Sequence, residues 1–301
     1  MAARRAAGFH GGMPRRAIPL ILLLALLWGG SFLFVGVALR EWPPLPIVLA
    51  RVGLATLALW AAVALLRLPV RRDAAALRAH LGMGVLNNVV PFALIVWAQG
   101  ALPSGVAAIL NATTPFWAVV LAHLAGAERA GPGRVLGVVI GFAGVAAMVG
   151  ADPFAAPWPA VAAMLAATFS YGLAGLWGQR LRLLAIPPPV AAAGQTGVST
   201  ALLLPAVLLG PLPAAPGGAT MAALAGLALL STALAYVLYF RVLELAGPVN
   251  LLLVTLIIPA FAAVLGWAVL GERLGWAHAA GMALIALGLS VMDGRIWRGN
   301  G

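Results

Sequence analysis

The chain has 301 residues, of which 63% are hydrophobic and 8% are charged, and its mean hydropathy is +1.07. A soluble domain carries about 25% charged residues, so this composition excludes a water-soluble globular protein. The net charge of +11 comes from short loops and not from a polar domain, so nucleic acid is not an expected partner. The chain has no cysteine, which excludes disulfides and thiolate metal sites.

Apolar stretches recur along the whole chain at the length of about 20 residues that crosses a bilayer as a helix. Lipid cannot satisfy an open strand edge, so we expect only helices. Loops are placed where proline, glycine and charged residues cluster. We therefore predict an all-α integral membrane protein with ten transmembrane helices, at about 17–39, 47–66, 80–99, 104–123, 132–150, 158–179, 188–210, 218–240, 248–269 and 275–293. The first run is too long for a signal-peptide core and is predicted to be a membrane helix.

The arginines predict the orientation, because short cytoplasmic loops accumulate basic residues. All 18 basic residues are arginine. With the N-terminus inside, Arg40 and Arg273 face outward, Arg51 lies within the second helix, and the other 15 are cytoplasmic. An even number of helices also puts both termini in the cytoplasm, as tails at 1–16 and 295–301.

The sequence contains an internal repeat. The segment SGVAAILNATTPFWAVVLAHLAGAERAGPGRVLGVVIGFAGVAAM aligns without gaps to PVNLLLVTLIIPAFAAVLGWAVLGERLGWAHAAGMALIALGLSVM, at a constant separation of 272 − 128 = 144 positions. The matched pairs include Pro115 with Pro259, Glu128 with Glu272, Gly137 with Gly281 and Gly144 with Gly288. The separation spans five helices, an odd number, so the halves 17–150 and 151–294 are predicted to cross the membrane in opposite senses. Inverted halves are typical of alternating-access transporters.

These segments, together with ALLWGGSF near the start and LARVGLATLAL in the second helix, resemble the two EamA-type repeats of the drug/metabolite transporter superfamily. Ala127 is a small departure, because the second copy has glycine there. The resemblance implies a multi-pass protein of the bacterial inner membrane that exports metabolites, with amino acids, including aromatic ones, ahead of other solutes. Drug efflux and nucleotide-sugar exchange are the alternatives, although nucleotide-sugar exchange would require several basic residues in the cavity.

The expected partners are a small-molecule substrate and the lipid bilayer, and we expect a monomer without cofactor. The four histidines show no paired i,i+4 spacing, so no metal site is expected. A membrane-embedded enzyme is disfavoured, because no nucleophiles, acids or metal ligands converge at one depth. A passive scaffold would not need an inverted repeat.

Three helices carry a proline close to the centre of the span, and each proline leaves the carbonyl four residues earlier without its helical donor. Those carbonyls belong to Asn87 before Pro91, Asn111 before Pro115 and Thr255 before Pro259. They are candidate substrate contacts near the midplane, and the prolines are candidate gating kinks. The alternative is that neighbouring helices satisfy these groups.

Other uncharged polar and aromatic residues lie deep in the predicted spans and complete the candidate substrate site. They are Trp28, Ser31, Asn88, Phe92, Thr114, Tyr171 and Ser231. Tyr236 and Tyr239 are nearer a cytoplasmic helix end, where an interfacial belt is the default. Arg51 is either a pathway residue that attracts a carboxylate or a tether to loop carbonyls near the outer interface.

Two further features are predicted to be structural. Glu128 and Glu272 follow helix ends, where capping and anchoring explain them more simply than a proton relay. Gly133, Gly137 and Gly141 form a small-residue ridge for close helix packing. No acidic residue is predicted in mid-span and no Walker-type loop is present, so we expect facilitated diffusion or exchange.

The orientation is testable by labelling. Cysteines introduced near Pro103 and near Pro216 should react with an impermeant thiol reagent in intact cells, because both loops are predicted to face outward. A cysteine near Arg71 should react only after the cells are permeabilised. Since the natural chain has no cysteine, each signal reports one position. Labelling of the Arg71 loop in intact cells would overturn the orientation.

Overall fold

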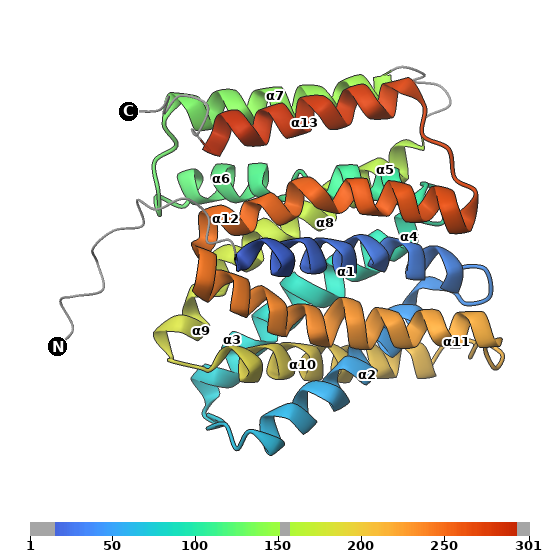
Figure 1. Cartoon of the computed structure of the whole chain (residues 1–301). Helices are drawn as coiled ribbons and strands as arrows, with labels where there is room; N and C mark the ends of the chain where they lie inside the picture. Colours follow the sequence, from blue (N-terminus) through green and yellow to red (C-terminus); the bar gives the residue numbers. More distant parts are fainter. Residues whose placement is uncertain (1–15, 151–156, 294–301) are drawn as a thin grey trace.

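The structure is a computed structural model that describes residues 16–150 and 157–293. Within these ranges it contains ten helical spans long and apolar enough to cross a membrane, and it assigns no strand to them. The predicted all-α architecture is thereby confirmed (Figure 1). The predicted tails at 1–16 and 295–301 fall outside the described residues, apart from Arg16.

Several spans are built from more than one helical element, and three elements, labelled η, are π-helices. The elements are α1 (Ala17–Ala38), α2 (Pro44–Leu65), α3 (Ala74–Gly84), η1 (Val85–Val89), α4 (Val90–Ala98), α5 (Ser104–Asn111), α6 (Thr114–Leu124), α7 (Pro132–Gly150), α8 (Trp158–Trp177), α9 (Gln179–Leu183), α10 (Pro188–Leu208), α11 (Gly218–Ala225), η2 (Gly226–Leu234), α12 (Ala235–Leu265), η3 (Gly266–Leu270) and α13 (Trp276–Asp293). The third span joins α3, η1 and α4, the fourth joins α5 and α6, and the sixth joins α8 and α9. The long element α12 contains the end of the eighth span and most of the ninth. Gly247 (φ 76°) has a non-helical backbone and marks the kink between these two spans.

Two predicted helix starts are wrong by several residues, for local chemical reasons. The second helix begins at Pro44 and not at 47, because a proline in the first turn loses no helical hydrogen bond. The third begins at Ala74 and not at 80, because the Asp73 carboxylate accepts a hydrogen bond from the Ala76 amide (2.9 Å) and caps the helix. Each change lengthens the helix on its N-terminal side.

The π-helices η1 and η2 occupy related positions in the two halves. Moving η1 by the repeat separation of 144 positions gives 229–233, which lies inside η2 (Gly226–Leu234). The predicted proline kinks are less symmetric. Two turn residues, Ala112 and Thr113, separate α5 from α6 just before Pro115, whereas α12 continues without interruption through Pro259.

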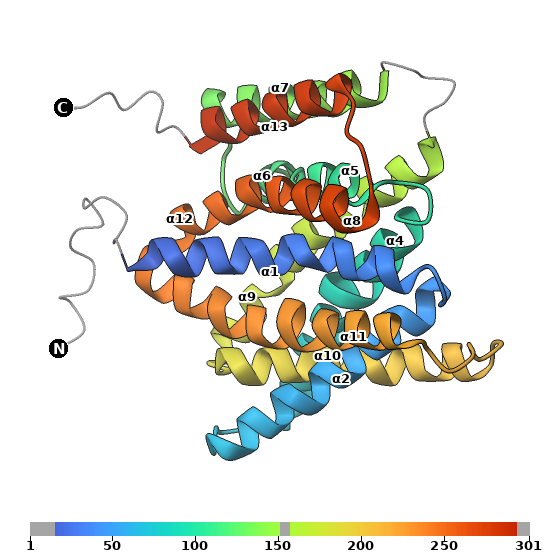
Figure 2. The same cartoon turned by 45° about the vertical axis from the view of Figure 1, so that its right-hand side comes forward.

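The bundle has a distinct outer pair, α7 and α13, which lie side by side at one edge in both views (Figures 1 and 2). Further in, α1 packs against α12 and α11, α8 packs against α4 and α6, and α10 packs against α2 and α3. Elements of both predicted halves therefore alternate through the interior. A site in the interior would be built from both halves.

Glycines of the repeat bring α7 and α13 together. A Cβ atom on Gly137 would lie 2.5 Å from the Gly288 carbonyl oxygen, and one on Gly144 would lie 2.9 Å from that of Gly281. Since Gly137 is related to Gly281 and Gly144 to Gly288, these two contacts exchange under the pseudo-two-fold axis. The predicted ridge packs closely on α13 at Gly137 and Gly141 but not at Gly133, where an added Cβ atom would lie 3.9 Å from its nearest neighbour, the Val291 carbonyl oxygen.

This packing predicts opposite effects for two glycines of one helix. Gly137→Ala should lower the free energy of unfolding by about 1–3 kcal/mol, because its Cβ overpacks the contact with α13. Gly133→Ala should be neutral or slightly stabilising, because its Cβ has room and alanine favours the helix. Thermal unfolding of the purified proteins in detergent measures both. Equal shifts in the two variants would contradict this account.

Candidate functional site

Five polar side chains form a hydrogen-bonded network in the interior, which we call the polar cluster. Its members are Asn87, Asn88, Gln195, Ser199 and Tyr236. The Asn87 amide donates to Gln195 Oε1 and to the Tyr236 hydroxyl, both at 3.1 Å. The Tyr236 hydroxyl donates to Asn88 Oδ1 (3.2 Å), and the Asn88 amide donates to Ser199 Oγ (3.2 Å). The polar cluster thus joins η1 of the first half to α10 and α12 of the second.

Close packing of η1 on α10 places these groups within reach. A Cβ atom on Gly84 would lie 3.0 Å from the Gln195 carbonyl oxygen, so the two backbones approach closely. The Ser199 hydroxyl lies 3.0 Å from the Gly84 carbonyl and 2.7 Å from that of Gln195. A single-turn π-helix is frequent at functional sites, because it re-aims side chains within a helix. Here it presents two consecutive amides, Asn87 and Asn88, to the polar cluster.

The carbonyl released by Pro91 is not the predicted one. In a π-helix a carbonyl pairs with the amide five residues later, so the partner missing at Pro91 belongs to Leu86 and not to Asn87. The Ser170 hydroxyl from α8 donates to the Leu86 carbonyl at 2.8 Å and replaces the lost bond. Asn87 contributes its side-chain amide instead.

Arg51 lies beside the polar cluster and is 7% exposed. Its Nε donates to Thr232 Oγ1 (3.0 Å), and its guanidinium carbon lies 3.6 Å from the centroid of the Phe92 ring. The sequence interpretation of a tether to loop carbonyls is wrong, because this hydrogen bond goes to a side chain of η2. Since α2 begins at Pro44, Arg51 is about 10 Å along the helix axis at 1.5 Å per residue.

Two tyrosines interact electrostatically with this arginine. Tyr171 and Tyr236 are both within electrostatic range of the Arg51 guanidinium, and Tyr171 packs on the apolar cluster that contains Phe92. The belt interpretation of Tyr236 is wrong, because its hydroxyl is hydrogen-bonded to Asn87 and Asn88 in the interior. Helical spacing could have found its role, because Tyr236 lies four residues after Thr232 and so shares its face.

Sequence reasoning also missed Gln195 and Ser199 of α10. These residues are four apart, so they share one face of a mostly apolar helix. Both are buried, at 4% and 0% exposed. A polar stripe on one face of a transmembrane helix was the available signal, because such a stripe is costly in contact with lipid.

The predicted residues of the first span and Ser231 form a separate contact region. The Ser231 hydroxyl donates to the Leu27 carbonyl (2.6 Å), and the Ser31 hydroxyl donates to that of Trp28 (2.6 Å). The ring centroids of Trp28 and Tyr239 are 5.8 Å apart. Both hydroxyls therefore donate to backbone carbonyls of α1. Ser231 links η2 to α1, whereas the bond of Ser31 lies within α1.

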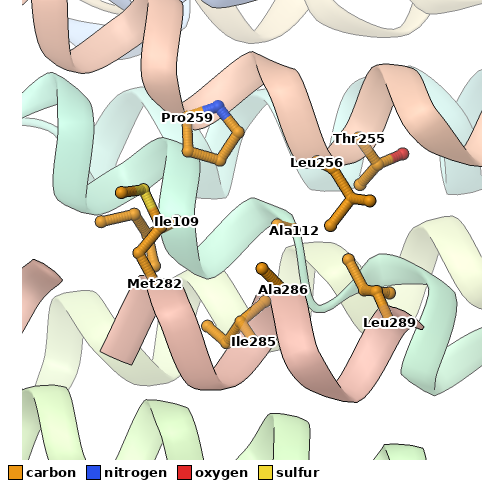
Figure 3. A pocket seen from close by; sticks show the side chains of 9 residues that line it. All are labelled: Ile109, Ala112, Thr255, Leu256, Pro259, Met282, Ile285, Ala286 and Leu289. Atoms are coloured by element: carbon orange, nitrogen blue, oxygen red, sulfur yellow. The ribbon is translucent and has the colours of Figure 1, made fainter. Parts of the chain in front are cut away.

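The remaining predicted contacts do not meet in one chamber. The Thr114 hydroxyl donates to the Asn111 carbonyl (2.8 Å), the group that Pro115 leaves without its helical donor. The Asn111 side-chain oxygen Oδ1 is buried without a hydrogen-bond partner among the described residues. Thr255 and Pro259 instead line a pocket with seven apolar residues, namely Ile109, Ala112, Leu256, Met282, Ile285, Ala286 and Leu289 (Figure 3). Its empty volume, open solvent included, is about 210 Å³.

The two related glutamates differ in their contacts. Glu272 accepts hydrogen bonds from the Ser104 amide (2.8 Å) and hydroxyl (2.9 Å), so it caps the start of α5. Glu128 instead pairs with Arg134 on the exposed surface. The helix end at Ser104 is therefore clasped to the end of the ninth span, and the related position in the first repeat makes no such clasp.

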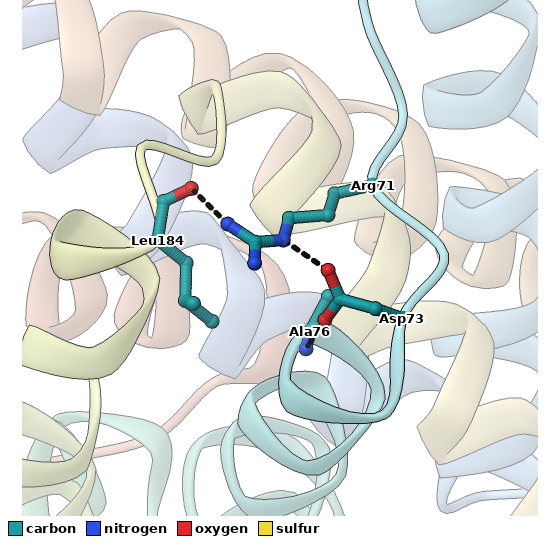
Figure 4. A network of polar contacts seen from close by, with 4 residues as sticks. All are labelled: Arg71, Asp73, Ala76 and Leu184. Carbon is teal, nitrogen blue, oxygen red and sulfur yellow. Dashed lines mark hydrogen bonds and ion pairs between the residues drawn. The ribbon is translucent and has the colours of Figure 1, made fainter.

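A second polar link joins the loops predicted to be cytoplasmic (Figure 4). Arg71 pairs with Asp73 and donates to the Leu184 carbonyl (3.5 Å), which follows α9. The Arg71 hydrogen bond, with that of the Ala76 amide, holds the pKa of Asp73 below its usual value. The carboxylate thus stays ionised at neutral pH and continues to cap α3.

The family follows from two matched segments, each of which contains five spans. Residues 15–150 and 158–292 match the model of the EamA-like transporter family. The chain belongs to the EamA-like transporter family. It is therefore a membrane transporter, and the prediction of two repeated halves is confirmed. The amino-acid-exporter subtype stays a prediction.

Relatives of this EamA-family protein support the same assignment. Over 269 residues it is 27% identical to "Uncharacterized inner membrane transporter YedA" of Escherichia coli strain K12, a match that covers 86% of each protein. Proteins of the same name from the O6:H1 and O157:H7 strains match equally. A structure described as "Crystal structure of protein" shares the fold, with a TM-score of 0.66 and 21% identity over 92% of this chain and 96% of that one. The chain is a multi-pass inner-membrane transporter.

The polar cluster predicts unequal effects for two neighbouring tyrosines. Tyr236→Phe removes the hydroxyl that joins Asn87 to Asn88, and should lower the free energy of unfolding by about 1–3 kcal/mol because it leaves the buried Asn88 side-chain oxygen without this donor. Tyr239→Phe is the matched control, because that hydroxyl has no hydrogen bond to the residues that the structure describes. Thermal unfolding in detergent measures both variants. A loss in Tyr239→Phe as large as that in Tyr236→Phe would refute the bridging role.

Proposed function

We propose that this transporter exports small metabolites, with neutral and aromatic amino acids as the first substrates to test, and that it works by alternating access of its two halves. The observation that carries the proposal is the polar cluster, because its hydrogen bonds join η1 of one half to α10 and α12 of the other. A group of amides and hydroxyls shared between halves would be rearranged when the halves move. A bound solute could then replace these internal hydrogen bonds.

The chemistry of the cluster suits a small solute with few charges. Amide and hydroxyl groups donate and accept, and aromatic rings of Phe92 and Tyr171 lie nearby. Rings of this kind pack well against a flat or apolar substrate. Uncharged polar groups in a membrane interior are costly unless they are paired, so a polar solute that completes their hydrogen bonds would be favoured.

Facilitated diffusion or exchange is the transport mode that we propose. Four of the acidic side chains that the structure describes already have local partners. Asp73 and Glu272 cap helices, Glu128 pairs with Arg134, and Glu244 pairs with Arg241. Uptake into proteoliposomes should therefore depend little on an imposed pH gradient. A strong dependence on the gradient would exclude the uniport mode.

Counterflow in proteoliposomes tests the function directly. A panel of labelled neutral and aromatic amino acids should include at least one that exchanges. Asn87→Ala and Asn88→Ala should slow that exchange by about tenfold or more, because they remove the two amides of η1 from the polar cluster at which the solute is proposed to bind. Trp276→Ala is the control at the surface, because Trp276 is 92% exposed. Wild-type rates in both site variants would refute their assignment to the pathway, and no exchange of any panel member would refute the amino-acid proposal.

A further inference from the structure

Most of the hydrogen-bonding capacity of Arg51 is unused. A guanidinium has five N–H donors, and in this structure only the Nε–H bond to Thr232 is formed with a described residue. No acidic side chain among the described residues forms an ion pair with Arg51, whereas Arg71, Arg134 and Arg241 each have one. Arg51 is therefore a buried cation whose two terminal nitrogens still have donors to offer.

Neighbouring groups hold the guanidinium in one orientation. Thr232 binds the Nε edge, and the Phe92 ring lies against the planar face at 3.6 Å. Thr232 is itself held, because its hydroxyl donates to the Leu227 carbonyl (2.9 Å) within η2. The edge that carries the two terminal nitrogens is left, and this edge matches the two oxygens of a carboxylate.

We propose that Arg51 binds the carboxylate of the transported solute through its terminal nitrogens, so that the substrates are small monocarboxylates, amino acids included. This inference rests on the proposed function and deepens it. A charged group inside a membrane span is expensive and marks a substrate pathway by default. An unpaired buried charge also contributes poorly to stability, so a ligand that completes the pair explains the residue better than a tether does.

The surroundings favour a single negative charge on the ligand. Apart from Arg51, the polar groups of the site are the uncharged amides and hydroxyls of the polar cluster, with Tyr171 and Tyr236 within electrostatic range of the guanidinium. One carboxylate and one guanidinium make a neutral pair in the low-dielectric interior. A phosphate ester would bring charge beyond what Arg51 can balance. The apolar part of the solute would lie along Phe92 and Tyr171.

A binding experiment on the purified, full-length protein tests this specificity. The probes share one skeleton: phenylpropanoate, phenylalanine, phenylalaninamide and phenethylamine. A ligand that binds the folded state raises the unfolding temperature, so the two carboxylates should raise it and the amide and amine should not. Alanine with alaninamide, and leucine with leucinamide, extend the comparison of acid and amide to aliphatic side chains. Equal shifts for acid and amide, or no shift with any carboxylate, would overturn the proposal.

Variants then assign the effect to Arg51. Arg51→Gln should weaken carboxylate binding by about 30-fold or more and abolish the preference for acid over amide. Arg51→Lys keeps the charge without the two-pronged geometry, so it should bind more weakly than wild type yet still prefer the acid; it covers the case in which the glutamine variant does not fold. Arg180→Gln is the matched control, because Arg180 also lies over an aromatic ring, that of Trp177 at 3.8 Å, but near a helix end.

Binding and transport separate this inference from the proposed function. Carboxylates that bind through Arg51 but are not exchanged in counterflow would support the site and refute the export of these solutes. If the Arg51→Gln variant still exchanges amino acids and keeps the wild-type preference for acid over amide, the result would support export and refute the site. Retention of acid preference in Arg51→Gln is thus the decisive contrary result.

Discussion

Every backbone carbonyl in the hydrocarbon region needs a donor from the protein itself, because lipid offers none. Prolines and π-turns in this transporter leave backbone carbonyls without their helical donors, and side-chain hydroxyls donate to these carbonyls instead. Ser170 binds the Leu86 carbonyl before Pro91, and Thr114 binds the Asn111 carbonyl before Pro115. Ser231 adds a similar bond to Leu27 across helices. Much of the hydroxyl content of the spans is therefore structural, and the side-chain amides of η1 carry the polar cluster.

The inverted repeat supplies matching parts that are used differently in the two halves. The glycines of α7 and α13 keep the two-fold relation, since their contacts exchange under it. The glutamates do not, since Glu272 caps α5 while Glu128 pairs with an exposed arginine. A repeat whose halves adopt unequal contacts suits alternating access, in which the two halves exchange conformations.

Arg51 gives the interior its electrostatic character. The amides and hydroxyls around it are neutral, so its charge dominates the field at the polar cluster, and the low dielectric of the interior strengthens any interaction made there. Phe92 and Thr232 cover its face and one edge without neutralising it. A solute that supplies the missing charge would meet a donor edge that is already oriented, which lowers the entropic cost of binding.

Composition and run length determined the ten-span architecture, since lipid permits only helices of a defined length, and the register of Pro115 with Pro259 determined the paired halves. The sequence also showed that Asn87, Asn88 and Tyr171 are polar or aromatic residues deep in their predicted spans. Only the tertiary structure decided which groups meet. Packing of α2 buried Arg51 against Phe92 and Thr232, and the π-register of η1 transferred the freed carbonyl from Asn87 to Leu86. Tyr236 and Gln195 joined the cluster because their helices, α12 and α10, meet η1 in the fold. Spacing within each helix could place these residues on an inward face, but it does not tell which residues of distant helices they meet there.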